Sequence, residues 1–564
     1  MSVRKMMCRV LLAAGAAAAS PRAFAAPAGE ARSFFRPGDI WVLSGDSITF
    51  IDLYRQTVED ALDHFHPGHG IRVVNTGVWG QLAKEAAGKG LALKPSVVTI
   101  LLGMNNVIHA DYDAASDFTR GAEAYVAQLR RQVRQYRSVG AAVVLLEPTL
   151  TDERENSYFG PSPETRRGLA AYGAALRRLA DEEQCFFVPL AAEFERAKRR
   201  LRPLQNFITD GVHPYGWGQY EIARSLIHHL NVSAPFPADG EPRGFSAADL
   251  PERDFAFSAA RRFAAAKDEP PALTVAAPGA CRATLAWSVE GSALRGETAL
   301  EFRGEPLTVT LPIPAAGLPA RPGCISRILV SVTPEGARPR LAVVDCARVV
   351  VHDLTKGVAR GEVRTAAARP EGPLVSTWEV REDGPDLWFE GRMFASSFPA
   401  RPKPPADTWM NSSGMNGVMM MLDLRPADRF ADNNFDRDMH MVCFSVLERP
   451  WAVLPLAWEG RRLANCLYGG AERTPDGYVW RIGVRGSLVD YRRFDVRKLD
   501  HFGANLIFND ADEKGVIGRF PAMPYPDLDV LTPERRLNQT MIFDRTGDVP
   551  QVGGETTNVG AYAL

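Results

Sequence analysis

The sequence predicts an α/β domain built on a parallel sheet, followed by all-β sandwich domains. Between residues 35 and 231, short apolar runs alternate with longer stretches in which apolar residues recur at helical spacing. This alternation favours a parallel sheet that carries helices on both of its faces. Beyond residue 272 the helical spacing largely stops, and short apolar runs are separated by Gly, Pro, Asp and Asn. That second pattern is typical of β-sandwiches.

Five apolar runs in the first region are short enough to be buried strands. They span residues 40–43, 71–74, 97–102, 143–146 and 186–188. The helical stretches cover residues 52–64, 118–136, 165–182 and 220–230. Strands and helices that alternate in this way through short connections are expected to form right-handed crossovers within one sheet.

The composition of the chain predicts five parts. They are a signal peptide at residues 1–25, the α/β domain at 35–231, a linker at 232–272, a small β-sandwich at 273–355 and a larger β-sandwich at 356–550. The linker is rich in Pro, Ala, Gly and charged residues, and a short helix is expected near residues 258–266. We expect the small sandwich to be a spacer or a docking domain.

The first 25 residues have the features of a secretion signal. Arg4, Lys5 and Arg9 precede an apolar run over residues 10–19, and an A-x-A cleavage site lies at residues 23–25. The apolar run is too short to span a bilayer well, and no later stretch is long and apolar enough to do so. We therefore expect export to the periplasm or the outside medium, with an uncleaved anchor or a disordered tail as the alternative.

The balance of charge gives no indication of a nucleic-acid partner. Basic and acidic residues number 66 and 67, so the net charge is −1. Hydrophobic residues make up 46% of the chain and charged residues 24%, which are the proportions of a globular protein. Neither a nucleic acid nor an acidic membrane surface is expected as a partner.

Six cysteines remain after the signal, an even number that permits disulfides in an exported chain. Cys281, Cys324 and Cys346 lie close together in one β-rich region, where one bridge would fit. Buried free thiols are the alternative. The spacing of Cys and His residues does not indicate zinc, and no metal or cofactor is expected.

Ser47 follows the first predicted strand, where open α/β sheets bind ligands. An alcohol is a weak nucleophile at neutral pH and needs a base, which in turn needs an acceptor that fixes its tautomer. His213 is the candidate base, and Asp210 stands three residues before it, close enough on a turn to be that acceptor. Alone, Gly-Asp-Ser indicates a turn and the histidine a helix cap.

Two further stretches follow the second and third predicted strands and offer donors for an oxyanion. Gly80 ends the stretch 75–80, and its N–H can approach a ligand closely because glycine has no side chain. Asn105 lies in the stretch 103–106, and its amide can donate to the same oxygen. Because the carboxyl ends of parallel strands share one edge of the sheet, Ser47, Gly80 and Asn105 should meet there.

These four stretches resemble the sequence blocks of the SGNH hydrolase superfamily, also called GDSL-like lipases and acylhydrolases. The matching residues are 45–47, the stretch ending at Gly80, 103–106 and 210–213. The resemblance covers about residues 35–230 and implies a flavodoxin-like three-layer fold. It also implies a Ser47–His213–Asp210 triad, with an oxyanion hole formed by the N–H groups of Ser47 and Gly80 and the Asn105 side chain.

One position departs from the pattern of the family. Asn106 stands where the family usually has Asp. In the family this Asp supports the loop. The presence of Asn therefore puts the rigidity of the loop in question more than catalysis.

Residues 374–542 resemble the carbohydrate-binding family 9-like sandwich. The matching stretches are 386–389, 418–423, 478–482 and 503–512. The resemblance implies glycan binding by stacking of aromatic rings on sugar faces, with Trp409, Trp451 and Trp458 as candidates. Core packing is the alternative role for each tryptophan. Asp510 and Asp512 are interpreted as a solvated turn rather than a calcium site.

Together these features predict an exported serine esterase that removes acyl groups, acetyl foremost, from a polysaccharide or oligosaccharide. A small acyl group is expected because Phe50, Ile51 and Trp79 lie beside the motif residues and would crowd the pocket, with ordinary core packing as their alternative role. The alternatives are a lipase or lysophospholipase, and an inactive glycan-binding surface protein. A large apolar lid, which would favour a lipase, is not evident in the sequence.

Overall fold

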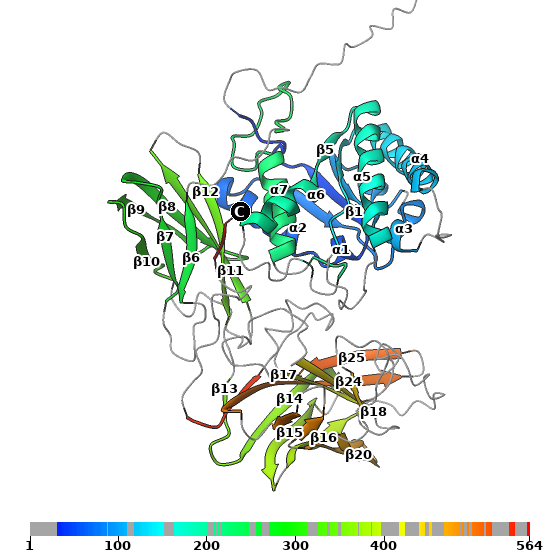
Figure 1. Ribbon diagram of the computed structural model, residues 1–564, viewed down its shortest axis with the longest axis vertical. Coiled ribbons are helices and arrows are strands. Elements are labelled where there is room, and N and C mark those ends of the chain that lie inside the picture. The colour runs from blue at the N-terminus through cyan, green and yellow to red at the C-terminus, as the bar shows by residue number, and fades with distance from the viewer. Residues whose placement is uncertain are drawn as a thin grey trace, which may run out of the picture.

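The computed structural model describes the following residues, and the statements below concern these residues only. They are 31–86, 88–109, 118–151, 163–200, 208, 211–214, 217–246, 255–261, 270–313, 325–335, 339–347, 351–369, 372–384, 386–395, 417–423, 439–445, 451–453, 467–485, 487–489, 493–495, 499–512, 515–521, 541–547 and 561–563. Along the chain they form an α/β unit, a first β unit and a second β unit (Figure 1).

The α/β unit is built on a five-stranded parallel sheet, as the sequence predicts. Its strands are β1 (Ile40–Gly45), β2 (Arg72–Asn75), β3 (Val97–Leu101), β4 (Ala142–Leu146) and β5 (Phe186–Val188). They lie in the order β2-β1-β3-β4-β5, and every neighbouring pair is parallel. Strand β1 is thus flanked by β2 and β3, and the direction of winding reverses beside it. Ligands bind at such a reversal in open α/β sheets.

Helices cover both faces of this sheet, with α2, α6 and α7 on one side and α3, α4 and α5 on the other (Figure 1). The helices are α1 (Ser47–Phe50), α2 (Leu53–Phe65), α3 (Met104–Ile108), α4 (Phe118–Ser138), α5 (Pro163–Glu182), α6 (Leu190–Arg200) and α7 (Trp217–His229). Two 3₁₀ turns, η1 (Ala83–Glu85) and η2 (Leu91–Leu93), follow β2. The sequence did not predict α6. The apolar side of this helix is narrow because it consists of Leu190, Phe194 and Ala197.

The first β unit consists of a three-stranded and a five-stranded sheet around a common core. Its strands are β6 (Ala256–Arg261), β7 (Ala272–Ala276), β8 (Cys281–Val289), β9 (Arg295–Phe302), β10 (Leu307–Thr310), β11 (Ile325–Pro334), β12 (Arg340–Ala347) and β27 (Ala561–Ala563). The sheets have the orders β10-β7-β6 and β27-β12-β11-β8-β9. Strand β27 comes from the end of the chain and pairs with β12, a long-range contact that the sequence did not indicate.

The expected linker at 232–272 differs from the structure in two ways. Residues 256–261 form strand β6 rather than the start of the helix expected near 258–266, because they pair with β7. Backbone pairing with a neighbouring strand overrides the helix propensity of the alanines there. Upstream, Arg243 donates to Asp39 at 2.7 Å, and Phe236 and Phe245 pack against the α/β core. Residues 232–246 are therefore part of the α/β unit.

The α/β unit and the first β unit share a buried interface. Along β11, Ile328 and Val330 face the core of the β unit, whereas Leu329 between them joins the core of the α/β unit. His64 in α2 bonds the hydroxyls of Ser288 at 2.7 Å and Ser331 at 2.8 Å. The first β unit is thus docked on α2.

Two buried polar groups hold this interface. Burial, with the charge of Arg295, lowers the pKa of His64 to about 4, so its neutral ring lies between two serine hydroxyls at neutral pH. Arg327 donates to Asp60 of α2 at 3.1 Å and to Glu290 of its own unit. A guanidinium shared by two carboxylates across an interface neutralises charge that burial would otherwise make costly.

The second β unit contains two larger sheets. The first has the order β13-β26-β24-β17-β18-β19, with β25 beside β24, and the second has the order β14-β15-β16-β21-β20. Their strands are β13 (Val351–Asp353), β14 (Val358–Arg369), β15 (Gly372–Asp383), β16 (Asp386–Phe394), β17 (Gly417–Asp423), β18 (Met439–Ser445), β19 (Trp451–Val453), β20 (Leu467–Thr474), β21 (Gly477–Arg485), β24 (His501–Asp512), β25 (Gly515–Pro521) and β26 (Met541–Asp544). A separate hairpin joins β22 (Ser487–Val489) and β23 (Arg493–Asp495).

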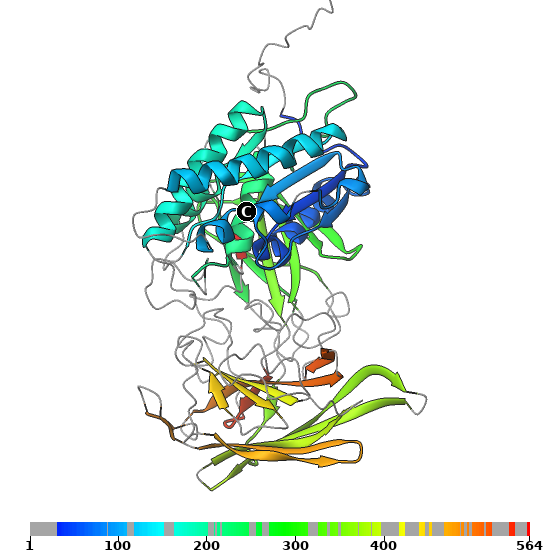
Figure 2. The same ribbon diagram turned by 90° about the vertical axis from the view of Figure 1, so that its right-hand side faces the viewer.

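The two larger sheets share one core. Trp480 of β21 lies with its ring centroid 5.9 Å from that of Phe508 of β24, and Phe389 and Val418 are buried in the same cluster. Figure 2 shows the two sheets as separate layers. All neighbouring strands are antiparallel except β13 and β26.

Several expectations concern residues outside the described part of the chain. These are the signal peptide at 1–25, Asp210, Trp409, Trp458, Cys324 and Cys466. The side chains of Trp451, Cys346, Cys443, Asp510 and Asp512 are likewise not described. Cys281 has a free thiol, so it does not form the disulfide considered for its region. No helix of the described residues is long and apolar enough to cross a membrane.

Arg327→Ala should lower the free energy of unfolding by about 3 kcal/mol at neutral pH, because it leaves two carboxylates at the interface without their shared cation. Arg303→Ala is the matched control in the same unit, where the arginine is 83% exposed and pairs with an exposed Glu301. It should cost less than about 0.5 kcal/mol. Denaturant unfolding measures both, and equal effects would contradict a stabilising role of Arg327.

Candidate active site

The ends of three strands bring the predicted catalytic stretches to one edge of the sheet. Leu43 of β1 pairs with Asn75 of β2, and Gly45 of β1 pairs with Leu101 of β3. Ser47 lies two residues beyond the end of β1. The stretch 75–80 begins at the last residue of β2, and the stretch 103–106 begins two residues beyond the end of β3. The parallel register therefore positions all three, as expected from the sequence.

The turn that carries Ser47 is tight, and glycine makes it possible. Ser47 is the first residue of α1, and the Asp46 side chain accepts a hydrogen bond from the Ile48 N–H at 3.0 Å as the helix cap. A Cβ atom at Gly45 would lie 1.9 Å from the Thr49 hydroxyl oxygen and 2.8 Å from a carbonyl of β3. Only glycine therefore lets α1 fold back against the end of the sheet.

Ser47 and His213 form a hydrogen-bonded pair. The distance between Ser47 Oγ and His213 Nε2 is 2.8 Å, although the two residues are 166 positions apart in the sequence. Both side chains are buried, at 4% and 6% exposure. This geometry allows the imidazole to take the hydroxyl proton directly. Asp210 lies outside the described residues, so its place behind the histidine stays a prediction.

The glycine stretch and Asn105 lie beyond the ends of β2 and β3, the two strands that flank β1. The Val78 N–H donates to the carbonyl of Gly45 at 3.2 Å, which fixes the glycine stretch against the end of β1. Gly80 has a φ of 68°, in the left-handed region that favours glycine. Asn105 is buried, and its Nδ2 lies 3.4 Å from the carbonyl oxygen of Gln81. Their role as oxyanion donors stays a prediction.

Asn106 performs the supporting role that its position in the motif implies. Its Oδ1 accepts the N–H of Ala83 at 3.0 Å, which connects α3 to the turn that follows the glycine stretch. A carboxylate at this position would offer the same acceptor oxygen. The departure from the usual Asp therefore preserves the bond that stiffens the loop.

Asn75 is a positioning residue that sequence reasoning did not single out. Its Nδ2 donates to the carbonyl of Thr49 at 2.7 Å and also to Asp52, and its Oδ1 accepts the N–H of Gly77 at 2.8 Å. One amide thus joins the serine turn to the glycine stretch. The available signal was a polar residue at the carboxyl end of an otherwise apolar strand.

Asp46 is a buried carboxyl group beside the serine. Burial raises its pKa from the ordinary 3.8 to about 6, although the Ile48 N–H and the charge of His213 act in the opposite direction. Above pH 6 the group is an anion that is only 1% exposed. That anion attracts the positive charge that His213 acquires when it accepts a proton.

Three exposed apolar side chains form a rim beside the pair. Phe50, Val78 and Trp79 are 42%, 43% and 37% exposed. The ring centroid of Trp79 lies 5.5 Å from that of His213 and 5.5 Å from that of Phe50. By contrast, Ile51 is buried and is not part of this rim. Exposed apolar patches of this kind mark contact surfaces.

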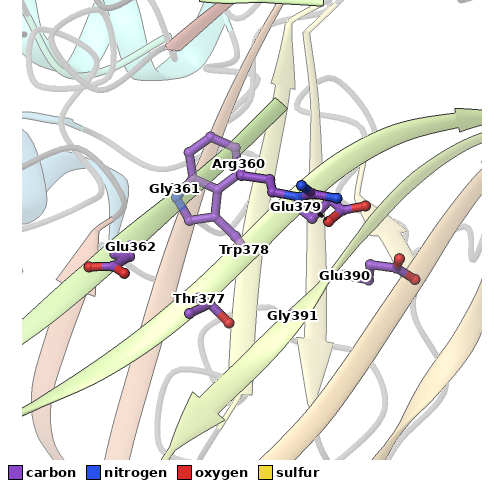
Figure 3. Close-up of a pocket in the computed structure, with 8 residues that line it drawn as sticks. All are labelled: Arg360, Gly361, Glu362, Thr377, Trp378, Glu379, Glu390 and Gly391. Carbon is purple, nitrogen blue, oxygen red and sulfur yellow. Dashed lines mark hydrogen bonds and ion pairs between the residues drawn. The ribbon is translucent and has the colours of Figure 1, made fainter. Parts of the chain in front are cut away.

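A separate hollow of about 420 Å³ lies on the sheet of β14, β15 and β16 in the second β unit (Figure 3). Its side chains are mainly charged: Arg360 donates to Glu379 at 2.5 Å, and Glu390 accepts from Arg381 at 2.8 Å. Thr377 adds a hydroxyl group. None of the predicted catalytic residues lines this hollow. Within the described parts of the chain, no group of three or more His, Cys, Asp or Glu residues is arranged to hold a metal ion.

Asp46→Asn should stabilise the protein increasingly as the pH rises. Asparagine keeps the oxygen that caps α1, but it removes a carboxyl whose folded pKa is raised from 3.8 to about 6. In the wild type, the raised pKa of Asp46 adds to the free energy of unfolding below pH 3.8. This contribution is lost as the pH rises through 6, and the loss amounts to about 3 kcal/mol.

Thermal unfolding of Asp46→Asn and the wild type at pH 4 and pH 8 measures this difference. Asp181→Asn, which removes a carboxyl that is 73% exposed, is the control for loss of a surface charge. A difference between Asp46→Asn and the wild type that does not change with pH would contradict the assigned burial.

Comparison with known proteins identifies relatives of the α/β unit. Residues 43–219 match the model of the GDSL-like Lipase/Acylhydrolase family. Over 182 residues the chain is 26% identical to an acetylxylan esterase of Geobacillus stearothermophilus, a match that covers 31% of this chain and 80% of that protein.

Similar solved structures include Axe2, an acetylxylan esterase from the same organism, which is 26% identical with a TM-score of 0.28 over 34% of this chain and 94% of that one. LAE5, an alpha/beta hydrolase enzyme from the metagenome of Lake Arreo in Spain, is 21% identical with a TM-score of 0.31, over 36% of this chain and 99% of that one. On the match of residues 43–219, the α/β unit is a GDSL-like lipase/acylhydrolase domain, and the protein is a carboxylic ester hydrolase.

Proposed function

We propose that the protein is an exported serine esterase that removes acetyl groups from an acylated polysaccharide or oligosaccharide. The observation that carries this proposal is the 2.8 Å hydrogen bond between Ser47 Oγ and His213 Nε2 at the switch point of the sheet. The similarity to an acetylxylan esterase supports an acetylated sugar as the substrate. Export rests on the signal-like residues 1–25.

The reaction proceeds by acyl transfer through Ser47. His213 Nε2 takes the hydroxyl proton as Ser47 Oγ attacks the ester carbonyl, and the oxygen of the tetrahedral intermediate becomes negatively charged. The N–H groups of Ser47 and Gly80 and the Asn105 amide stabilise that charge. His213 then gives the proton to the departing sugar hydroxyl, and water, activated by the same imidazole, releases acetate. Asp210 completes the triad by fixing the tautomer of His213.

The burial of Ser47 and the exposure of the rim support a small acyl group on a sugar. Ser47 is only 4% exposed, and we expect such a buried hydroxyl to be reached more easily by a small acyl group than by a long one. An alkyl chain gains most from full burial, whereas Phe50, Val78 and Trp79 are about two-fifths exposed. A sugar ring has apolar C–H faces and polar edges, so it suits aromatic side chains that stay partly in water.

In the same proposal, the second β unit binds the polysaccharide and so holds the enzyme close to its substrate. Its resemblance to a carbohydrate-binding sandwich suggests this role, and the hollow lined by Thr377, Glu379 and Glu390 offers acceptors for sugar hydroxyls (Figure 3). A binding unit tethered to a catalytic unit raises the local concentration of substrate.

Ser47→Ala should reduce hydrolysis of p-nitrophenyl acetate by more than about 10³-fold while the protein stays folded. The neighbouring Ser44→Ala on β1 is the matched control and should keep its activity. Fluorophosphonate should label the wild type and Ser44→Ala but not Ser47→Ala. A wild type that does not react would point to an inactive glycan-binding protein, and an active Ser47→Ala would refute the nucleophile.

A substrate screen tests the acyl group and the alcohol together. We expect acetate release from acetylated xylan or a related acetylated polysaccharide, and faster turnover of p-nitrophenyl acetate than of p-nitrophenyl octanoate. The physical reason is the low exposure of Ser47, which is 4%. Faster turnover of octanoate, or hydrolysis of micellar lysophospholipid in preference to acetylated sugars, would favour the lipase alternative instead.

A further inference from the structure

Gln219 is a completely buried glutamine in the first turn of α7, and its amide bonds three segments of the active site. Nε2 donates to the carbonyl of Pro214 at 2.9 Å and to the carbonyl of Ile48 at 3.1 Å. Oε1 accepts the N–H of Tyr54 at 3.1 Å. A primary amide carries two hydrogens on its nitrogen, so both are engaged.

The two carbonyls that Gln219 holds adjoin the two members of the catalytic pair. Ile48 follows Ser47 directly in α1, and Pro214 follows His213. The 2.8 Å bond between Ser47 Oγ and His213 Nε2 is therefore accompanied by a second connection between the same two segments, through one rigid side-chain amide. Two distant parts of the chain are joined next to the atoms that exchange the proton.

The bond to Tyr54 fixes which way the amide points. The first N–H groups of a helix have no acceptor within it, and Asp52, the N-cap of α2, makes no side-chain cap bond. Gln219 Oε1 supplies an acceptor to this end of α2. With the oxygen engaged there, Nε2 must face the two carbonyls.

We propose that Gln219 is a positioning residue that sets the distance between the Ser47 hydroxyl and the His213 imidazole. It touches neither substrate nor reacting atoms and acts through the backbone of Ile48 and Pro214. An error of about 1 Å in such a geometry can cost about 100-fold in rate. The proposal rests on the serine mechanism but not on the identity of the sugar.

Gln219→Leu in the full-length chain removes all three bonds with a side chain of similar size. We expect kcat for p-nitrophenyl acetate to fall about 10- to 100-fold, with KM changed less than about threefold because the rim at Phe50 and Trp79 stays in place. The rate of fluorophosphonate labelling should fall by the same factor as kcat, because both report the activation of Ser47.

Gln219→Glu tests the direction of the two donated bonds. Glutamate keeps an oxygen for Tyr54, but an ionised carboxylate would repel the carbonyls of Ile48 and Pro214. Burial favours the protonated form, which restores one donor at lower pH. The kcat of this variant relative to the wild type should therefore fall as the pH rises from 6 to 8.5. A side chain that merely filled space would give a constant ratio.

Ser225→Ala is the matched control on the same helix. Ser225 is also completely buried, and its hydroxyl donates to the carbonyl of Glu221 at 2.8 Å within α7. Its loss should lower stability but leave kcat within about twofold of the wild type. Circular dichroism verifies that each variant is folded, and if Gln219→Leu does not fold, the pH series of Gln219→Glu decides.

Three results would overturn the proposal. They are a kcat of Gln219→Leu within twofold of the wild type, a loss that appears in KM alone, and a ratio for Gln219→Glu that does not vary with pH. An active Ser47→Ala would instead refute the serine mechanism itself. The two failures are therefore distinguishable in the same assay.

Discussion

The hydrogen bond between Ser47 Oγ and His213 Nε2 sets the constraint that the α/β unit has to satisfy. Proton transfer requires the two atoms to be within about 3 Å, and they are 2.8 Å apart on segments separated by 166 residues. The parallel sheet brings the serine to the correct edge, but a sheet edge by itself fixes positions only approximately. The side-chain amides of Asn75 and Gln219 and the glycines around the serine turn add further contacts between these segments.

The polar groups around Ser47 show how a stable fold accommodates a reactive site. Asn75 joins the glycine stretch to the serine turn, and Gln219 joins the serine turn to the histidine loop. Each uses a side-chain amide, which donates and accepts and therefore satisfies several backbone groups at once. Asp46 is different, because burial raises the pKa of its carboxyl and makes the anion costly above pH 6. This buried anion interacts with the imidazole of His213, and its negative charge favours the protonated imidazole that forms during the reaction.

Helix α2 connects the catalytic edge with the rest of the molecule. Its first turn is bonded by Gln219 behind the serine, and near its other end Asp60 and His64 are bonded by Arg327, Ser288 and Ser331 of the first β unit. Alternate side chains of β11 serve two cores, which is possible because successive residues of a strand face opposite sides. The first β unit is consequently an extension of the catalytic unit. The second β unit has its own core, formed between its two sheets.

The sequence by itself determined the strands and most helices of the α/β unit, because their apolar periodicity follows directly from the burial that each element needs. It also predicted that Ser47 and His213 would meet, as their hydrogen bond shows, while the oxyanion roles of Gly80 and Asn105 stay predictions.

Only the tertiary structure decided that residues 256–261 pair as a strand, that β27 returns to β12, and that Gln219 joins three segments. These features depend on partners far away in the chain, and the residues that make them carry no local pattern. The sequence does not distinguish Gln219 from other glutamines in helices, because its role depends on the residues that surround it in space.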